Sequence, residues 1–337
     1  MKRALTVLIL LFITGFIQCC TRTEKKEVVV YTSVDQVFSE PILKDFEKET
    51  GIKVNAVFDV EAAKTVGLVN RLLAEKGRPT ADVFWNSEIG RTIVLKRNGV
   101  LASYRSPSAE DIPTKFKDPE DYWTGFATRA RVLIYNTNLL KEEELPKSIF
   151  ELTDKKWKGK VALGNPLLGT IATHVAAMYA SFGQEKAEAY LKALKANDVV
   201  IVDGNAVAKD LVAEGKLPIA FTDTDDVNVA IQSGKPVKII YPDKEGIGTV
   251  LIPNTVALIN GAPHPDEGKR LIDYLLSREI ESKLAFCESV QIPVREGVET
   301  PLHVPKLSSI KIMDVDYYKI ADNVEKAVEC AQNIFVR

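Results

Sequence analysis

The residues best suited to chemistry in this chain lie in one short turn, Thr222-Asp223-Thr224-Asp225-Asp226. An apolar stretch with strand character, 217–221, precedes the turn, and a stretch compatible with a helix, 227–233, follows it. The carboxyl end of a strand is the usual place for a ligand in an open α/β sheet. A helix cap needs only one such residue and stabilises the helix by about 1 kcal/mol. Because three acids exceed that need, we expect at least one of them to contact a ligand.

Polar residues also follow other predicted strands, and several of them precede predicted helices. Asp35 could equally cap a helix, and Trp85 could equally pack in a core. The candidate ligand-binding residues are Ser33, Asp35, Trp85, Asn86, Ser87, Glu88, Arg129, Thr170, Asn205, Asp223, Thr224 and Asp225.

The charges around these residues favour two different kinds of ligand group. Predicted helix starts after Ser33, Gly169, Asn205 and Thr224 would offer free backbone N–H groups to an anion. Arg129 and its neighbour at position 131 would lie on one face of a strand, where they could bind an anion or form salt bridges with surface acids. The acids instead favour a positive group. A zwitterion, or a cation with a companion anion, would satisfy both.

The elements that position these residues form two α/β series. Strands and helices alternate from residue 28 to residue 99, which predicts a mainly parallel sheet, and a second series begins at residue 160. Stretches 126–136 and 249–259 are expected to cross between the two. We therefore predict an α/β fold with two lobes, each a mainly parallel sheet flanked by helices, joined by a hinge over a cleft. Lobe one is expected to comprise 28–130 and 245–337, and lobe two 131–244. Other expected helices are 34–50, restarting near Glu40, and 61–76, 263–286 and 314–335.

The N-terminus is expected to lie outside the fold. Lys2 and Arg3 precede an apolar run that is too short to span a bilayer comfortably, which is typical of an export signal over 1–19. Cys20 follows it and looks like the lipidated cysteine of bacterial lipoproteins, with 20–27 as a tether. Ordinary secretion with cleavage nearby is the alternative. Cys287 and Cys330 could form a disulfide or remain as free thiols.

Composition excludes two classes of function. A formal net charge of −2 gives no electrostatic basis for binding nucleic acid. The chain has three histidines and none of the common nucleophile, metalloprotease or phosphate-loop motifs, which argues against an enzyme. We expect an exported monomer that is anchored to the membrane by its lipid.

Several segments, in this order, carry a family resemblance: Val30 to Ser33, Phe46 to Val54, Ala81 to Phe84, Arg131 to Asn136, Gly169-Thr170, and Pro253 to Leu258. Over roughly residues 27–300 the chain resembles bacterial extracellular solute-binding proteins of ABC importers, specifically the ferric-iron-binding group. The resemblance implies a periplasmic binding protein fold of type II, with no catalysis and no cofactor. It also implies capture of a small polar solute or metal ion in the cleft and delivery to a membrane permease.

The ferric group typically holds iron through two adjacent tyrosines on the strand-to-helix turn of lobe two, where this chain has 222–226. The acids Asp35, Glu88, Asp223 and Asp225 would instead make an all-carboxylate metal site, which suits hard cations, Fe³⁺ among them. Ferric iron with a companion anion is the family default. The alternative is an organic cation or a zwitterion such as an aminophosphonate, with Trp85 as a cation–π partner. A secreted enzyme and a structural lipoprotein are more distant alternatives.

Overall fold

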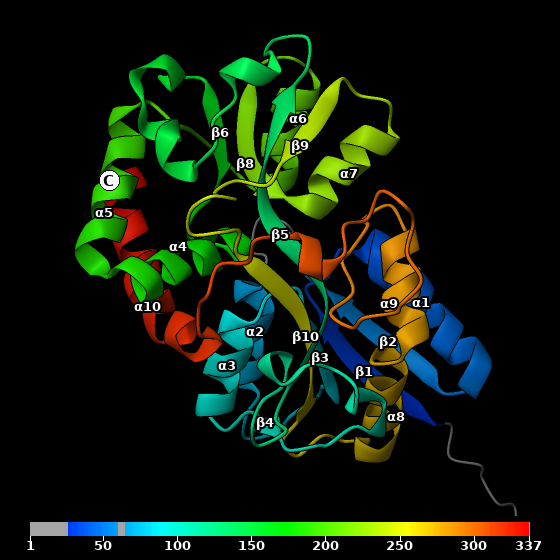
Figure 1. Ribbon diagram of the computed structural model, residues 1–337. Coiled ribbons are helices and arrows are strands. Elements are labelled where there is room, and N and C mark those ends of the chain that lie inside the picture. The colour runs from blue at the N-terminus through cyan, green and yellow to red at the C-terminus, as the bar shows by residue number, and fades with distance from the viewer. Residues whose placement is uncertain (1–25, 60–64, 337) are drawn as a thin grey trace, which may run out of the picture.

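The computed structural model describes residues 26–59 and 65–336 and has two lobes (Figure 1). The expected export signal and Cys20 lie outside the described residues. No helix in the described ranges is both long enough and apolar enough to cross a membrane.

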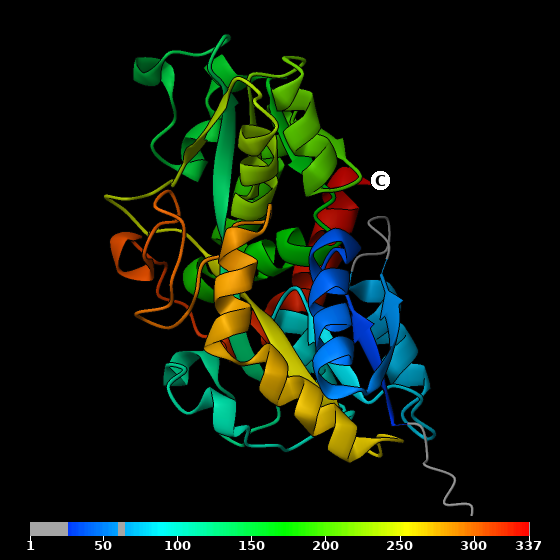
Figure 2. The same cartoon turned by 90° about the vertical axis from the view of Figure 1, so that its right-hand side faces the viewer.

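Lobe one is built on parallel strands with helices on both faces. Its sheet has β1 between β2 and β3, and both pairings are parallel. One face packs against α1, α8 and α9, which lie side by side in Figure 2, and the other against α2 and α3. The elements are β1 (Glu27–Thr32), α1 (Gln36–Thr50), β2 (Lys53–Phe58), α2 (Val66–Ala74), β3 (Val83–Asn86), α3 (Gly90–Arg97), β4 (Leu101–Ala102), α8 (Pro265–Leu275) and α9 (Arg278–Phe286).

Lobe two repeats this plan on a smaller scale. Strand β6 is parallel to both β7 and β8, and helices again cover both faces. The elements are β6 (Val161–Gly164), α4 (Gly169–Phe182), α5 (Gln184–Ala196), β7 (Val200–Val202), α6 (Asn205–Ala213), β8 (Ile219–Asp223), α7 (Thr224–Gln232) and β9 (Val237–Ile240).

Two long strands join the lobes. The first part of β5 (Thr124–Asn136) pairs antiparallel with β10 (Leu251–Ile259), and its second part pairs with β8 and β9. Every residue of β5 is buried, because the strand runs through the cores of both lobes. This confirms the expected two-lobed α/β fold, with crossings close to 126–136 and 249–259.

The last helix belongs to both lobes. Helix α10 (Tyr317–Phe335) places Ile320 and Val324 in the core of lobe two, beside α4 and α5. Its Asp322 pairs with Arg97 of α3 in lobe one, with a nitrogen–oxygen distance of 2.7 Å. In Figure 1, α10 spans the side of the molecule between α4 and α3. The expected assignment of all of 245–337 to lobe one therefore does not describe this helix.

Several predicted helices have different bounds. The stretch 263–286 forms two helices, because the chain leaves the helix after Leu275 and the Ser277 hydroxyl caps the next one by accepting from the Ile280 N–H. Helix α1 continues through Pro41, so the restart near Glu40 is absent. Helix α2 begins at Val66, and residues 60–64 lie outside the described ranges. Helix α10 begins at Tyr317, three residues later than predicted.

Candidate functional site

The acidic turn is held by a buried network around Asp223. This residue ends β8, directly opposite Arg131 of β5 in the strand register. Arg131 Nη1 donates to its Oδ1 over 2.7 Å, and Thr170 Oγ1 and Asn205 Nδ2 donate to its Oδ2 over 2.5 and 2.9 Å. The Asp223 side chain does not cap α7. Its carboxylate instead joins β5, α4 and α6 at the carboxyl ends of the lobe-two strands.

Arg131 forms the base of this network. Its side chain is fully buried, with the guanidinium 4.5 Å from the ring centroid of Phe221. Nη1 also donates to Asn205 over 3.2 Å. A buried guanidinium requires a buried counter-ion, so the Asp223 charge is a structural requirement of lobe two.

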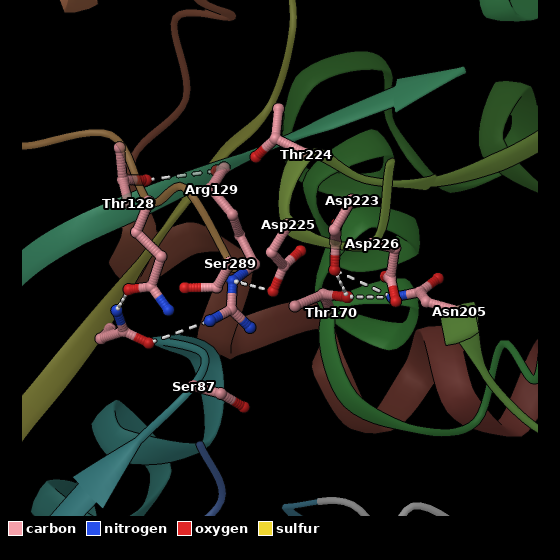
Figure 3. A network of polar contacts seen from close by, with 12 residues as sticks. Ser87, Thr128, Arg129, Thr170, Asn205, Asp223, Thr224, Asp225, Asp226 and Ser289 are labelled. Atoms are coloured by element: carbon pink, nitrogen blue, oxygen red, sulfur yellow. Dashed lines mark hydrogen bonds and ion pairs between the residues drawn. The ribbon is translucent and has the colours of Figure 1, made fainter. Parts of the chain in front are cut away.

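Arg129 pairs with the second acid of the turn. Arg129 Nε lies 3.4 Å from Asp225 Oδ2 (Figure 3). Its Nη2 donates to Asn254 Oδ1 over 3.2 Å. Burial lowers the pKa of Arg129, but the charges of four acids, Asp225 first, outweigh it and raise the pKa. The prediction that Arg129 and Arg131 share one face of their strand is confirmed, since both reach the acidic turn.

A small cavity lies between the lobes beside this turn. Its volume is ≈ 30 Å³, which is room for an ion or for one or two waters. Five aspartates and one arginine are among its lining residues. The lining from lobe one and the crossing strand is Asp35, Ser87 and Arg129, and that from lobe two is Leu168, Gly169, Thr170, Ile171, Asp203, Gly204, Asn205, Asp223, Asp225 and Asp226.

The cavity brings together acids that could hold a metal ion. One carboxylate oxygen from each of Asp223, Asp225 and Asp226 lies within 4.8 Å of the others. Asp226 also accepts a hydrogen bond from Thr222 Oγ1 over 3.0 Å. Oxygen donors at this spacing suit a hard cation. Facing these acids, the first residues of α4 and α6 also line the cavity, and the first turn of a helix carries a partial positive charge.

Three predicted ligand residues support the loops instead of lining this cavity. Trp85 is 0 % exposed and packs against Phe126 in the core of lobe one, with ring centroids 5.9 Å apart. It therefore offers no cation–π face to the cavity. Ser33 Oγ donates to Asn86 Oδ1 over 2.6 Å, and Asn86 Nδ2 donates to the Glu88 carbonyl over 2.6 Å. These bonds fix the turns after β1 and β3.

Glu88 and Thr224 likewise are not among the residues that line the cavity. Both carboxylate oxygens of Glu88 accept hydrogen bonds, from the Arg91 N–H and from Thr173 Oγ1. Thr224 Oγ1 accepts from the Ala130 N–H over 3.1 Å, which ties α7 to β5. The expected metal set of Asp35, Glu88, Asp223 and Asp225 is therefore not gathered as a group.

Several residues of the site were not among the predicted ligand residues. Asp226 belongs to the acidic turn itself, and Asp203 follows β7 as the predicted residues follow their strands. Their position after a strand was a usable signal. The sequence indicated Arg131 as a possible anion-binding or salt-bridge residue, but only the strand register brings it to Asp223. Asn254 carried no comparable signal.

Comparisons with known proteins agree with this architecture. A sequence profile described as "Bacterial extracellular solute-binding protein" matches residues 79–320. The chain belongs to the bacterial extracellular solute-binding proteins. It is 27 % identical over 301 residues to "Iron uptake protein A1" of Synechocystis, covering 86 % of this chain and 82 % of that protein.

Other members of the family differ in what their names say they bind. The chain is 34 % identical over 262 residues to the "Putative 2-aminoethylphosphonate-binding periplasmic protein" of Salmonella typhimurium, covering 75 % of this chain and 73 % of that protein. The structure of a "Ferric binding protein from Campylobacter jejuni" superposes with a TM-score of 0.83 at 24 % identity, covering 91 % of this chain and 99 % of that one. That likeness establishes the two-lobed fold.

Among the described residues, no tyrosine lines the cavity. Tyr31, on the strand that precedes Asp35, is engaged elsewhere, with its hydroxyl 2.8 Å from Thr80 Oγ1 and 3.0 Å from Glu75 Oε2. The donors available to a cation are thus carboxylates, hydroxyls and amide oxygens.

Proposed function

We propose that this chain is the solute-binding component of an ABC importer and captures a small solute that carries positive charge. The observation that carries the proposal is the charge of the cavity. Five aspartates and one arginine are among the residues that line it, so acidic side chains predominate in the lining. A positively charged group would be attracted to these carboxylates.

A hard metal cation, with ferric iron as the first candidate, fits this cavity best. The three acids of the turn offer only oxygen donors within coordinating distance of one another. The cavity of ≈ 30 Å³ matches an ion and a small companion better than a larger solute. Iron is also named for the Synechocystis relative. The helix starts of α4 and α6, with Arg129, supply the positive side that a companion anion needs.

A zwitterion is the second candidate. Helix N-termini and Arg129 face the aspartates across one cavity, which suits a solute with an anionic and an ammonium end. The name of the Salmonella relative points to 2-aminoethylphosphonate, a molecule of this kind. Such a solute would require the lobes to part further than they do here, by hinge motion at β5 and β10.

A ligand titration distinguishes these candidates. The full chain, stripped of metal and held in detergent micelles, is heated with ferric citrate, MnCl₂, CaCl₂ or 2-aminoethylphosphonate. Ligand at one hundred times Kd adds about 2.7 kcal/mol to the free energy of unfolding and raises the melting midpoint. We expect a rise with ferric or another hard cation. Asp226→Asn should weaken it, because the variant removes one cavity charge and keeps an oxygen that can accept from Thr222.

The matched control is Asp210→Asn, which makes the same change at an exposed residue of α6 that pairs with its neighbour Lys209. This variant should leave the titration unchanged. A rise with 2-aminoethylphosphonate and none with metals would replace the first candidate by the second. No rise with any of these ligands would refute both.

We further propose that residues 1–19 direct export and that a lipid on Cys20 holds the receptor at the membrane, near its permease. The support is the sequence pattern and the family, whose members include periplasmic proteins. A receptor that only transfers its solute needs no catalytic group, and the relatives and the fold are those of binding proteins. A monomer is sufficient for this role, because both walls of the cavity come from one chain.

A further inference from the structure

Glu88, expected to bind the ligand, instead connects the two lobes. It follows β3 in lobe one, and its Oε1 accepts from the Arg91 N–H over 3.0 Å at the start of α3. Its Oε2 accepts from Thr173 Oγ1, on α4 of lobe two, over 2.7 Å. Glu88 is 1 % exposed and Thr173 is 2 % exposed. A charged acceptor and its donor therefore meet across the lobe interface, shielded from water.

The chain is closely packed at Gly90, beside this bond. A Cβ atom added to Gly90 would lie 3.1 Å from Val324 Cγ2 of α10 and 3.2 Å from Glu88 Oε2. Helices α3, α4 and α10 thus approach one another closely beside the bond. A rotation that parts α3 from α4 would move Glu88 and Thr173 apart. Their hydrogen bond spans 2.7 Å, so this rotation would break it.

The bond also lies next to the cavity. Thr173 is one helical turn after Thr170, so both side chains are on the same face of α4. Thr170 donates to Asp223 and lines the cavity from lobe two, while Ser87, the residue before Glu88, lines it from lobe one. The bond therefore exists when the two cavity walls are brought together.

We propose that Glu88 is an interlobe latch, whose hydrogen bond with Thr173 favours the closed arrangement of the lobes. A contact made in one conformation and lost in another shifts their ratio by its net free energy. A buried hydrogen bond to a charged group is strong enough to shift that ratio by about tenfold or more. The latch proposal depends on the proposed function in one respect, namely that closure of the lobes retains the solute. Glu88 is accordingly a positioning residue and not a solute ligand.

The test measures lobe closure without any added solute. The four native cysteines are replaced by serine, and spin labels are placed at Val37→Cys and Val207→Cys in the full chain in detergent micelles. These side chains are 72 % and 37 % exposed, and each lies two residues beyond a cavity residue, Asp35 or Asn205. Pulsed electron paramagnetic resonance then gives the fraction of molecules with a short interlobe distance.

Thr173→Val and Glu88→Ala should each lower the ratio of closed to open molecules about tenfold. The double variant should lower it no further than either single one, because both remove the same bond. Glu88→Gln, which keeps a neutral hydrogen bond, should have a smaller effect, and it serves where Glu88→Ala fails to fold. The control is Thr50→Val, which removes a hydroxyl that donates within α1 to the Phe46 carbonyl.

Three results would overturn the latch. These are an unchanged distance distribution in both single variants, additive effects in the double variant, and the absence of a closed fraction in the parent protein. Because no solute is present, these results leave the ligand titration of the proposed function untouched. Conversely, a ligand titration without any rise in the melting midpoint would not change the interlobe distances, so it would not bear on the latch.

Discussion

Removing the charge of Asp223 should destabilise lobe two whether or not a solute is present. Asp223→Asn keeps the shape of the side chain and removes its charge. Arg131 Nη1 donates to one carboxylate oxygen, and Thr170 and Asn205 donate to the other. These three hydrogen-bond partners all act as donors, so the amide NH₂ of an asparagine would face a donor in either orientation.

The magnitude follows from burial. Arg131 is 0 % exposed and Asp223 is 2 % exposed, so the variant leaves a guanidinium in the interior without its counter-ion. Removing one partner of a buried ion pair lowers the free energy of unfolding by about 3–5 kcal/mol. Adding Arg131→Met removes the orphaned charge and leaves one side of the introduced amide free of a donor, so the double variant should lose less than Asp223→Asn alone. Asp226→Asn, at a half-buried position, should cost about 1 kcal/mol or less.

Urea unfolding, followed by circular dichroism, measures these free energies, provided that the slope of the transition is the same in all variants. Comparing the single and double variants isolates the coupling between residues 131 and 223. A cost below about 1 kcal/mol for Asp223→Asn would refute a structural role for the pair. A double variant that is no more stable than Asp223→Asn would refute the coupling.

Three further predictions concern other residues. Burial, and then the charge of Arg131, hold the pKa of His174 well below its ordinary value, so the unfolded chain takes up the proton first. The free energy of unfolding should therefore fall as the pH drops below about 6.5, by up to about 1.4 kcal/mol per pH unit. In urea unfolding, His174→Phe should show a smaller decrease with pH. An equal decrease in both proteins would contradict this. Dithiothreitol should leave the melting midpoint unchanged, because Cys287 and Cys330 are free thiols; a lowered midpoint would indicate a disulfide. Cys20→Ser should move the protein from the membrane fraction to the soluble fraction of cells, and a protein that stays with the membrane would refute the lipid anchor.

The fold was predictable because its signals are local. Alternating strand and helix patterns, with turn residues between them, indicated two parallel α/β series and two crossing strands, which correspond to β5 and β10. The errors had different causes. The break between α8 and α9 lies in a stretch whose helical pattern is continuous, and the Ser277 cap, a contact over three residues, was overlooked. The position of α10 depends on its packing against α4, which its own sequence does not specify.

For the site, the sequence correctly placed the acidic turn 222–226 at the carboxyl end of a strand. It could not assign partners to the side chains of that turn. Asp35, Ser87, Thr170 and Asn205 do line the cavity with the acidic turn. Trp85 does not, because the alternation of side chains along β3 directs it into the core instead.

By itself, the sequence determined that three acids of 222–226 would lie at the carboxyl end of a strand, since strand and helix propensities are properties of neighbouring residues. Only the tertiary structure decided their roles. Asp223 neutralises Arg131 because the pairing of β5 with β8 sets the two opposite each other. Glu88 binds Thr173, 85 positions away, because two lobes meet there. Such contacts depend on register and packing between distant segments, and a local pattern carries no information about either.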